Sequence, residues 1–254
     1  MRIKKKAPKP SAKRPPLYLI GYRGACPLSE ELALWFDSAY GGPLKIVREN
    51  GAPESWHVSH GPWTAHVVIP LPSTHSAGFA DHLSWEHDKV GAVAPSVMPP
   101  RDMPDSLLLA ARLARGLTLL TQGTAHDIAT QQYLNPSDWN DRALSHFVVD
   151  DHVLITEDDQ GEANEIWCYT LGLTKFGIDE LETFFPRGIS DRAAKELLAE
   201  TASELIRLGQ SPKVGTALSL PILNRTVTIA GHRTAAPTGR MMGFRHVKPT
   251  EQCV

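Results

Sequence analysis

Cysteine is scarce in this sequence. Only Cys26, Cys168 and Cys253 occur among 254 residues. Three cysteines, a small and uneven number, argue against the disulfide framework on which small secreted domains depend. Such a low count is typical of proteins from a reducing compartment. We therefore expect a cytoplasmic protein.

Long apolar runs are also lacking. The longest apolar segment, around residues 107–120, is interrupted by Arg112 and Arg115, whereas a membrane-spanning helix needs about 20 mostly apolar residues. The N-terminus is basic but lacks the apolar stretch of a secretory signal. These two absences predict a chain with no membrane span.

Acidic residues are missing from the start of the chain. Residues 1–16 contain seven bases, four prolines and no acid, while the rest has 19 bases against 28 acids and a net charge of −9. Like charges and prolines favour disorder, so we predict that residues 1–16 form a disordered basic tail. The tail is either a solvated extension or an electrostatic arm for nucleic acid, the ribosome or a membrane surface. The acidic body is a poor partner for nucleic acid, so any such contact would come through the tail.

The remaining composition is that of a globular protein with a sizeable core, 42 % hydrophobic and 21 % charged. In residues 17–100, apolar periodicity predicts six elements in the order strand, helix, strand, strand, helix, strand. This order is that of the ferredoxin-like unit. The expected elements are strands 17–22, 44–48, 64–71 and 90–98 and helices 28–39 and 79–87.

A second set of elements follows. We predict helices over 107–120 and 190–208, and strands over 128–134, 147–156, 166–171 and 225–230. Helices and strands are mixed along the chain, and most of the expected strand pairs are antiparallel. This pattern indicates an α+β protein rather than a doubly wound α/β protein. We expect two packed lobes, an N-terminal lobe over residues 17–100 and a C-terminal lobe over 101–247.

One stretch carries a family signal. Residues 172–182 read GLTKFGIDELE. This resembles the G-L-x-x-F-G-x-x-E-L-E pattern of an uncharacterised family of bacterial proteins, the domain-of-unknown-function family 4261. The order of elements over roughly residues 62–220 is also similar to that family. The resemblance implies a fold but no activity, because the family has none to carry over. We interpret Gly172 and Gly177 as turn residues that let a strand break and resume.

The same stretch ends in three carboxylates. If residues 180–185 are extended, Glu180 and Glu182 share one face of a strand and Leu181 faces the other way. We expect both glutamates on the solvent side. Together with Asp179 they are candidate binding residues, for a metal or as an acid/base pair, against the alternative of a solvated strand edge.

Cys26 is the main chemical candidate. It lies in GACPLS, between an expected strand and an expected helix, where the helix N-terminus favours a thiolate. The alternative is an inert thiol in a turn. Trp139 is a further candidate for binding, because tryptophan is enriched at interfaces, although it also anchors cores.

Several histidines cluster between residues 57 and 87, but no HExxH, CxxC or similar triplet occurs. We therefore expect no metal and no cofactor. Serine-hydrolase and phosphate-binding motifs are missing as well. The sequence favours a non-enzymatic binding or protein-interaction module. The alternative is a thiol-dependent enzyme or redox protein that uses Cys26.

Overall fold

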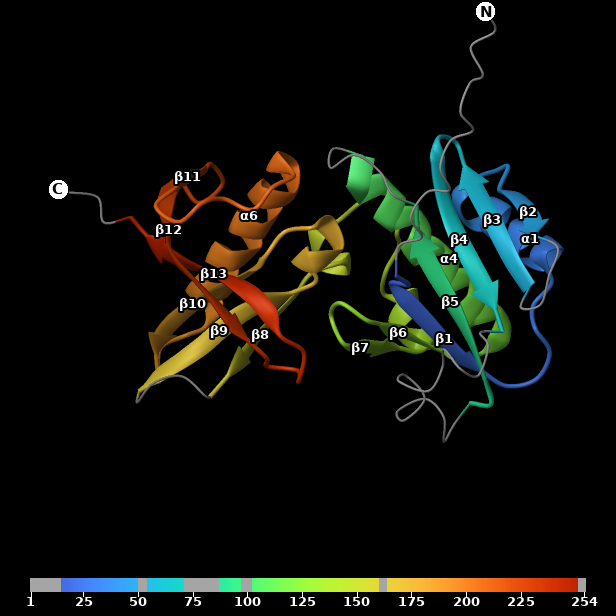
Figure 1. Cartoon of the computed structure of the whole chain (residues 1–254), viewed down its shortest axis with the longest axis horizontal. Coiled ribbons are helices and arrows are strands. Elements are labelled where there is room, and N and C mark those ends of the chain that lie inside the picture. Colours follow the sequence, from blue (N-terminus) through green and yellow to red (C-terminus); the bar gives the residue numbers. More distant parts are fainter. Residues whose placement is uncertain (1–14, 50–53, 71–86, 97–101, 160–163, 251–254) are drawn as a thin grey trace, which may run out of the picture.

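The computed structural model describes residues 15–49, 54–70, 87–96, 102–159 and 164–250. The fold is α+β, and each of its two lobes is built on one sheet (Figure 1). Among these residues no helix has the length and apolar character needed to cross a membrane. The tail expected over residues 1–16 lies almost entirely outside the described part, as does the helix expected over 79–87.

The first lobe holds a seven-stranded antiparallel sheet in the order β2-β3-β4-β5-β1-β6-β7. Helices α1 and α4 pack on it and on each other. The elements are β1 Tyr18–Tyr22, α1 Ser29–Tyr40, β2 Lys45–Glu49, β3 Glu54–His60, β4 Trp63–Ile69, β5 Lys89–Pro95, α4 Met103–Thr121, β6 Thr124–Asp127 and β7 Gln132–Leu134.

This lobe contains the ferredoxin-like order, but some of the elements that form it differ from those predicted from the sequence. Strands β4, β5, β1 and β6 lie side by side, so that β1 runs parallel to β4 across β5, and β5 runs parallel to β6 across β1. The second helix of the unit is α4 and its last strand is β6. The hairpin of β2 and β3 is an addition at one edge, and β3 was not predicted.

The boundary expected between residues 100 and 101 therefore does not separate the two sheets. Helix α4 buries Leu109, Leu113 and Leu117 in the first core, while its first turns place Met103 and Leu107 in the second core. A helix that is apolar on so many sides packs against two layers at once. Residues 103–134 complete the first sheet and the helical layer that covers it.

The strand expected over 128–134 is wrong in its bounds. The chain turns at residues 128–131, between β6 and β7. The turn forms because Asp127 Oδ1 accepts hydrogen bonds from the backbone N–H groups of Ala129 and Thr130. Aspartate commonly reverses a chain in this way.

The second lobe holds a six-stranded sheet in the order β11-β12-β13-β10-β9-β8, antiparallel except for the pair β10 and β13. Helix α6 covers one face, where Leu198 and Leu205 pack with Leu181 and Val247. Helix α5 Pro136–Asn140 packs against α4 and β7 and so belongs to the first lobe. The elements of the second lobe are η2 Val149–Asp151, β8 Leu154–Asp158, β9 Glu165–Leu171, η3 Leu173–Phe176, β10 Glu180–Pro186, α6 Arg192–Leu208, β11 Ala217–Leu220, β12 Arg225–Ala235 and β13 Met242–Pro249.

Candidate functional site

Glu180 lies in the interior, not on the solvent side as expected. Its carboxylate accepts hydrogen bonds from the backbone N–H groups of Gly172, Leu173 and Thr174, at 2.9, 3.2 and 3.1 Å, and from the Thr170 hydroxyl at 2.8 Å. The turn between β9 and β10 leaves the Gly172 and Leu173 N–H groups buried, and buried N–H groups need an acceptor. Glu180 supplies it, so its role is structural.

Burial raises the pKa of Glu180 above its ordinary value, while the N–H donors and the Thr170 hydroxyl act in the opposite direction. A carboxylate so fully occupied has little capacity left for a ligand. Glu180 therefore stabilises the turn and is not available as a binding residue.

The two glycines occupy positive-φ conformations, in agreement with their interpretation as turn residues. Gly172 has φ 121° and Gly177 has φ 73°. A Cβ atom at Gly172 would lie 2.3 Å from the backbone oxygen of His152, whereas one at Gly177 would meet no atom within 4 Å. A side chain at position 172 is thus disfavoured both by the backbone conformation and by the lack of space. At position 177 only the backbone conformation disfavours a side chain.

The same turn joins the two lobes. The Lys175 ammonium lies 2.5 Å from the Asp127 carboxylate of β6, donates to the His152 backbone oxygen at 2.9 Å and lies 5.6 Å from the centre of the Tyr18 ring. Both charged side chains are almost fully buried, at 0 % and 1 % exposure. This ion pair is a structural contact between the lobes.

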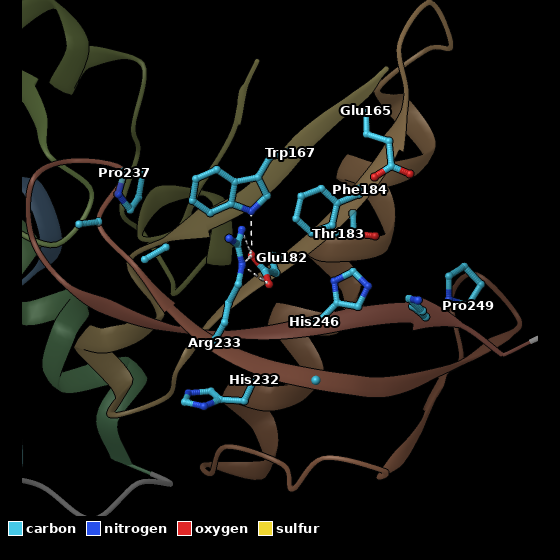
Figure 2. A pocket seen from close by; sticks show the side chains of 14 residues that line it. Glu165, Trp167, Glu182, Thr183, Phe184, His232, Arg233, Pro237, His246 and Pro249 are labelled. Carbon is cyan, nitrogen blue, oxygen red and sulfur yellow. Dashed lines mark hydrogen bonds and ion pairs between the residues drawn. The ribbon is translucent and has the colours of Figure 1, made fainter. Parts of the chain in front are cut away.

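Glu182 is also buried, but it faces away from α6 into a pocket of about 990 Å³ (Figure 2). The pocket lies on the face of the second sheet opposite α6, and strands β9, β10, β12 and β13 line it. Trp167, Phe184, Arg233 and His246 point toward one another across it. Aromatic, cationic and acidic groups therefore converge on one surface.

An arginine, a carboxylate and an indole form the centre of this pocket. Arg233 Nε lies 2.9 and 2.8 Å from the two oxygens of Glu182, and Arg233 Nη2 lies 2.7 Å from one of them. The Trp167 indole N–H donates to Glu182 at 2.9 Å. The guanidinium also lies 4.8 Å from the Trp167 ring centre and 5.4 Å from that of Phe184. These contacts hold Arg233 in place although its side chain is 46 % exposed.

His246 and two exposed charges complete the pocket. The His246 ring lies 5.5 Å from the Phe184 ring, and burial lowers the pKa of His246. A neutral imidazole can both donate and accept a hydrogen bond. Lys248 on β13 and Glu165 on β9 are exposed and lie on strands either side of β10.

The structure places two other predicted binding residues elsewhere. Asp179 is half-buried and paired with Arg245 at 2.8 Å, so it does not converge with the two glutamates on a metal. Trp139 is 1 % exposed and packs in the first core, 6.3 Å from the Tyr18 ring. Trp139 therefore packs as a core residue and does not present its ring on the surface of the described chain. Of the four candidates only Glu182 lines the pocket.

Cys26 is half-buried in the turn before α1. Its sulfur lies 2.9 Å from the Tyr22 hydroxyl, and burial, together with this contact, raises the pKa of Tyr22. Cys168 lies in the core of the second lobe, where burial raises its pKa to about 11. Cys253 lies outside the described residues.

Sequence reasoning missed most of the pocket. Arg233 lies on a part of β12 beyond the predicted strand, and His246 lies on β13, which was not predicted at all. The alternating series Met242, Phe244, His246 was the available signal, because a period of two is typical of one strand face.

Comparison with known proteins returned no relative. No protein-family model, no curated protein and no solved structure matches this chain.

Proposed function

We propose that the protein is a cytoplasmic, non-enzymatic interaction module that binds a peptide segment of a partner protein in the pocket of the second sheet. The motif at residues 172–182 supports membership of the bacterial domain-of-unknown-function family 4261. The observation that carries the binding proposal is the Trp167–Arg233–Glu182 cluster, set in place beside Phe184 and open to solvent on one side.

The chemistry of the pocket suits a peptide. Tryptophan and arginine are the residues that most often supply binding energy at protein interfaces. Glu182 neutralises Arg233, so the exposed charges that remain are Lys248 and Glu165, one of each sign. A peptide can present an apolar side chain to Phe184, backbone amides to His246 and charged side chains to both rims.

The test is a peptide-display selection against the full chain, followed by titration of the enriched peptides. We expect saturable binding that weakens at least tenfold in His246→Ala and in Lys248→Glu. Leu34→Ala is the matched control, because Leu34 is 74 % exposed on α1, in the other lobe.

Binding that the pocket variants leave unchanged would refute this site. Saturable binding of small molecules alone, with no peptide enriched, would refute the peptide assignment. Turnover of a substrate that a single substitution abolishes would refute the non-enzymatic assignment.

A second candidate function rests on the contact between Cys26 and the Tyr22 hydroxyl at 2.9 Å. A hydroxyl placed there can donate to a thiolate and stabilise it, as a thiol-dependent enzyme or redox protein requires. The test is the rate of Cys26 alkylation against pH. A rate that follows an ordinary thiol, with a pKa of about 8.5, removes this candidate.

A further inference from the structure

Three potential metal ligands lie together on the first sheet, on the face opposite α1 and α4. They come from neighbouring strands: Glu49 from β2, His57 from β3 and His66 from β4. His57 is directly opposite His66 in the pairing of β3 with β4, and Glu49 is one pleat away, opposite Ser55. The backbone register therefore fixes all three on one patch of surface.

Their side chains converge. His57 Nε2 lies 2.7 Å from one Glu49 oxygen, and His66 Nε2 lies 3.6 Å from the other. One ligand atom from each residue can be chosen so that all three lie within 4.8 Å of one another. Ligands about 2.0 to 2.2 Å from a tetrahedral zinc ion are separated by roughly 3.3 Å, so small rotations of these side chains would suffice.

We infer that Glu49, His57 and His66 form a binding site for a divalent transition-metal ion, with Zn²⁺ as the ion that suits the ligands best. Two imidazoles and one carboxylate are a common ligand set of zinc sites that keep a fourth position for water or another ligand. Glu49 and His57 are exposed and His66 is partly buried, so an ion could reach the site and a fourth ligand could approach from solvent. This site is separate from the pocket of the second sheet.

The surroundings orient the carboxylate. The Ser55 hydroxyl donates to Glu49 Oε2 at 2.5 Å, and Ser55 Oγ lies 3.4 Å from His66 Nε2. Polar groups that hold metal ligands in place are a regular part of metal sites. The sequence conceals the set, because the ligands are separated by 8 and 9 positions along the chain and only strand pairing brings them together.

The competing explanation is an ion pair between Glu49 and a protonated histidine. The Glu49 side chain is 40 % exposed and that of His57 is 58 % exposed, and exposed pairs of this kind contribute little to stability. The two explanations differ in one observable, a stoichiometric metal complex.

The experiment titrates Co²⁺ into the full chain after chelator treatment and records the visible absorption spectrum. We expect one equivalent with the intense bands of a four-coordinate ion, displaced by Zn²⁺. Glu49→Gln and His66→Ala should each weaken binding at least tenfold, with unchanged circular dichroism.

His60→Ala is the matched control. His60 is on β3 as well, but its ring faces the helices, 5.1 Å from that of Phe36, so this variant should bind as the wild type does. The inference fails if no such spectrum appears, or if Glu49→Gln binds Co²⁺ like the wild type, because either result leaves an ion pair only. If His66→Ala unfolds, the Glu49→Gln variant still decides the test, provided that it stays folded.

Discussion

Replacing Lys175 by methionine should strongly destabilise the protein, because it leaves a buried carboxylate without its cation. The Asp127 side chain is 1 % exposed, and Lys175 is the ion-pair partner that faces it. Removing one member of a buried pair typically costs about 3 to 5 kcal/mol. Asp127 keeps the two backbone N–H groups of Ala129 and Thr130, so we expect the lower end, about 3 kcal/mol. At roughly 2 to 4 °C per kcal/mol for a chain of this size, the melting temperature should fall by about 6 to 12 °C.

The assay is urea unfolding followed by circular dichroism, with a double-mutant cycle. Asp127→Asn keeps the acceptor of the turn, so the double variant should lose at least about 1.5 kcal/mol less than the sum of the single ones. Lys195→Met is the control, because Lys195 is 39 % exposed in its pair with Asp191 and should lose about 0.5 kcal/mol or less. A loss below 1 kcal/mol in Lys175→Met, or strict additivity in the cycle, would refute the reasoning.

Three further predictions concern the turn, a histidine and the thiols. Gly172→Ala should cost at least 3 kcal/mol and Gly177→Ala about 1 to 2 kcal/mol by urea unfolding, since only the first adds a clash with backbone to an unfavourable φ; equal losses would contradict this. Burial lowers the pKa of His152 well below its ordinary value, so the unfolded chain takes up the proton first and stability falls as the pH drops below about 6.5, by at most about 1.4 kcal/mol per pH unit. The difference in unfolding free energy between His152→Leu and the wild type should reveal this slope, and parallel pH curves would contradict it. Iodoacetamide at pH 8 should modify Cys26 well before buried Cys168 in peptide mass spectrometry, and the reverse order would contradict the placement of Cys168 in the core.

Elements with a periodic apolar pattern could be predicted from the sequence, but the pairing of strands that are far apart along the chain could not. The helix expected over 190–208 appears as Arg192–Leu208, because its apolar stripe repeats within one element. The closure of the first lobe by β6 could not be predicted, since it depends on which edge of β1 remains available after β5 has paired.

The candidate sites show the same limit. Strand alternation correctly placed Leu181 against α6 and both glutamates on the other face. It could not reveal that Trp167 and Arg233 would contact Glu182 and that the turn after β9 would enclose Glu180. Burial of a strand face depends on neighbours from other parts of the chain, which a local pattern does not contain.

Helix α4 and strand β6 determine which fragments of this chain could fold on their own. A fragment that ended near residue 100 would lack the helix that covers β1, β4 and β5, and would leave one edge of β1 unpaired. Such an edge is a template for strand addition by another chain, so the fragment should aggregate. A fragment that began near residue 101 would carry the apolar side of α4 without its sheet. A fragment that keeps the first lobe intact must extend beyond α5, because Leu144 is buried in the first core and Arg112 donates to the Leu144 and Ser145 backbone oxygens.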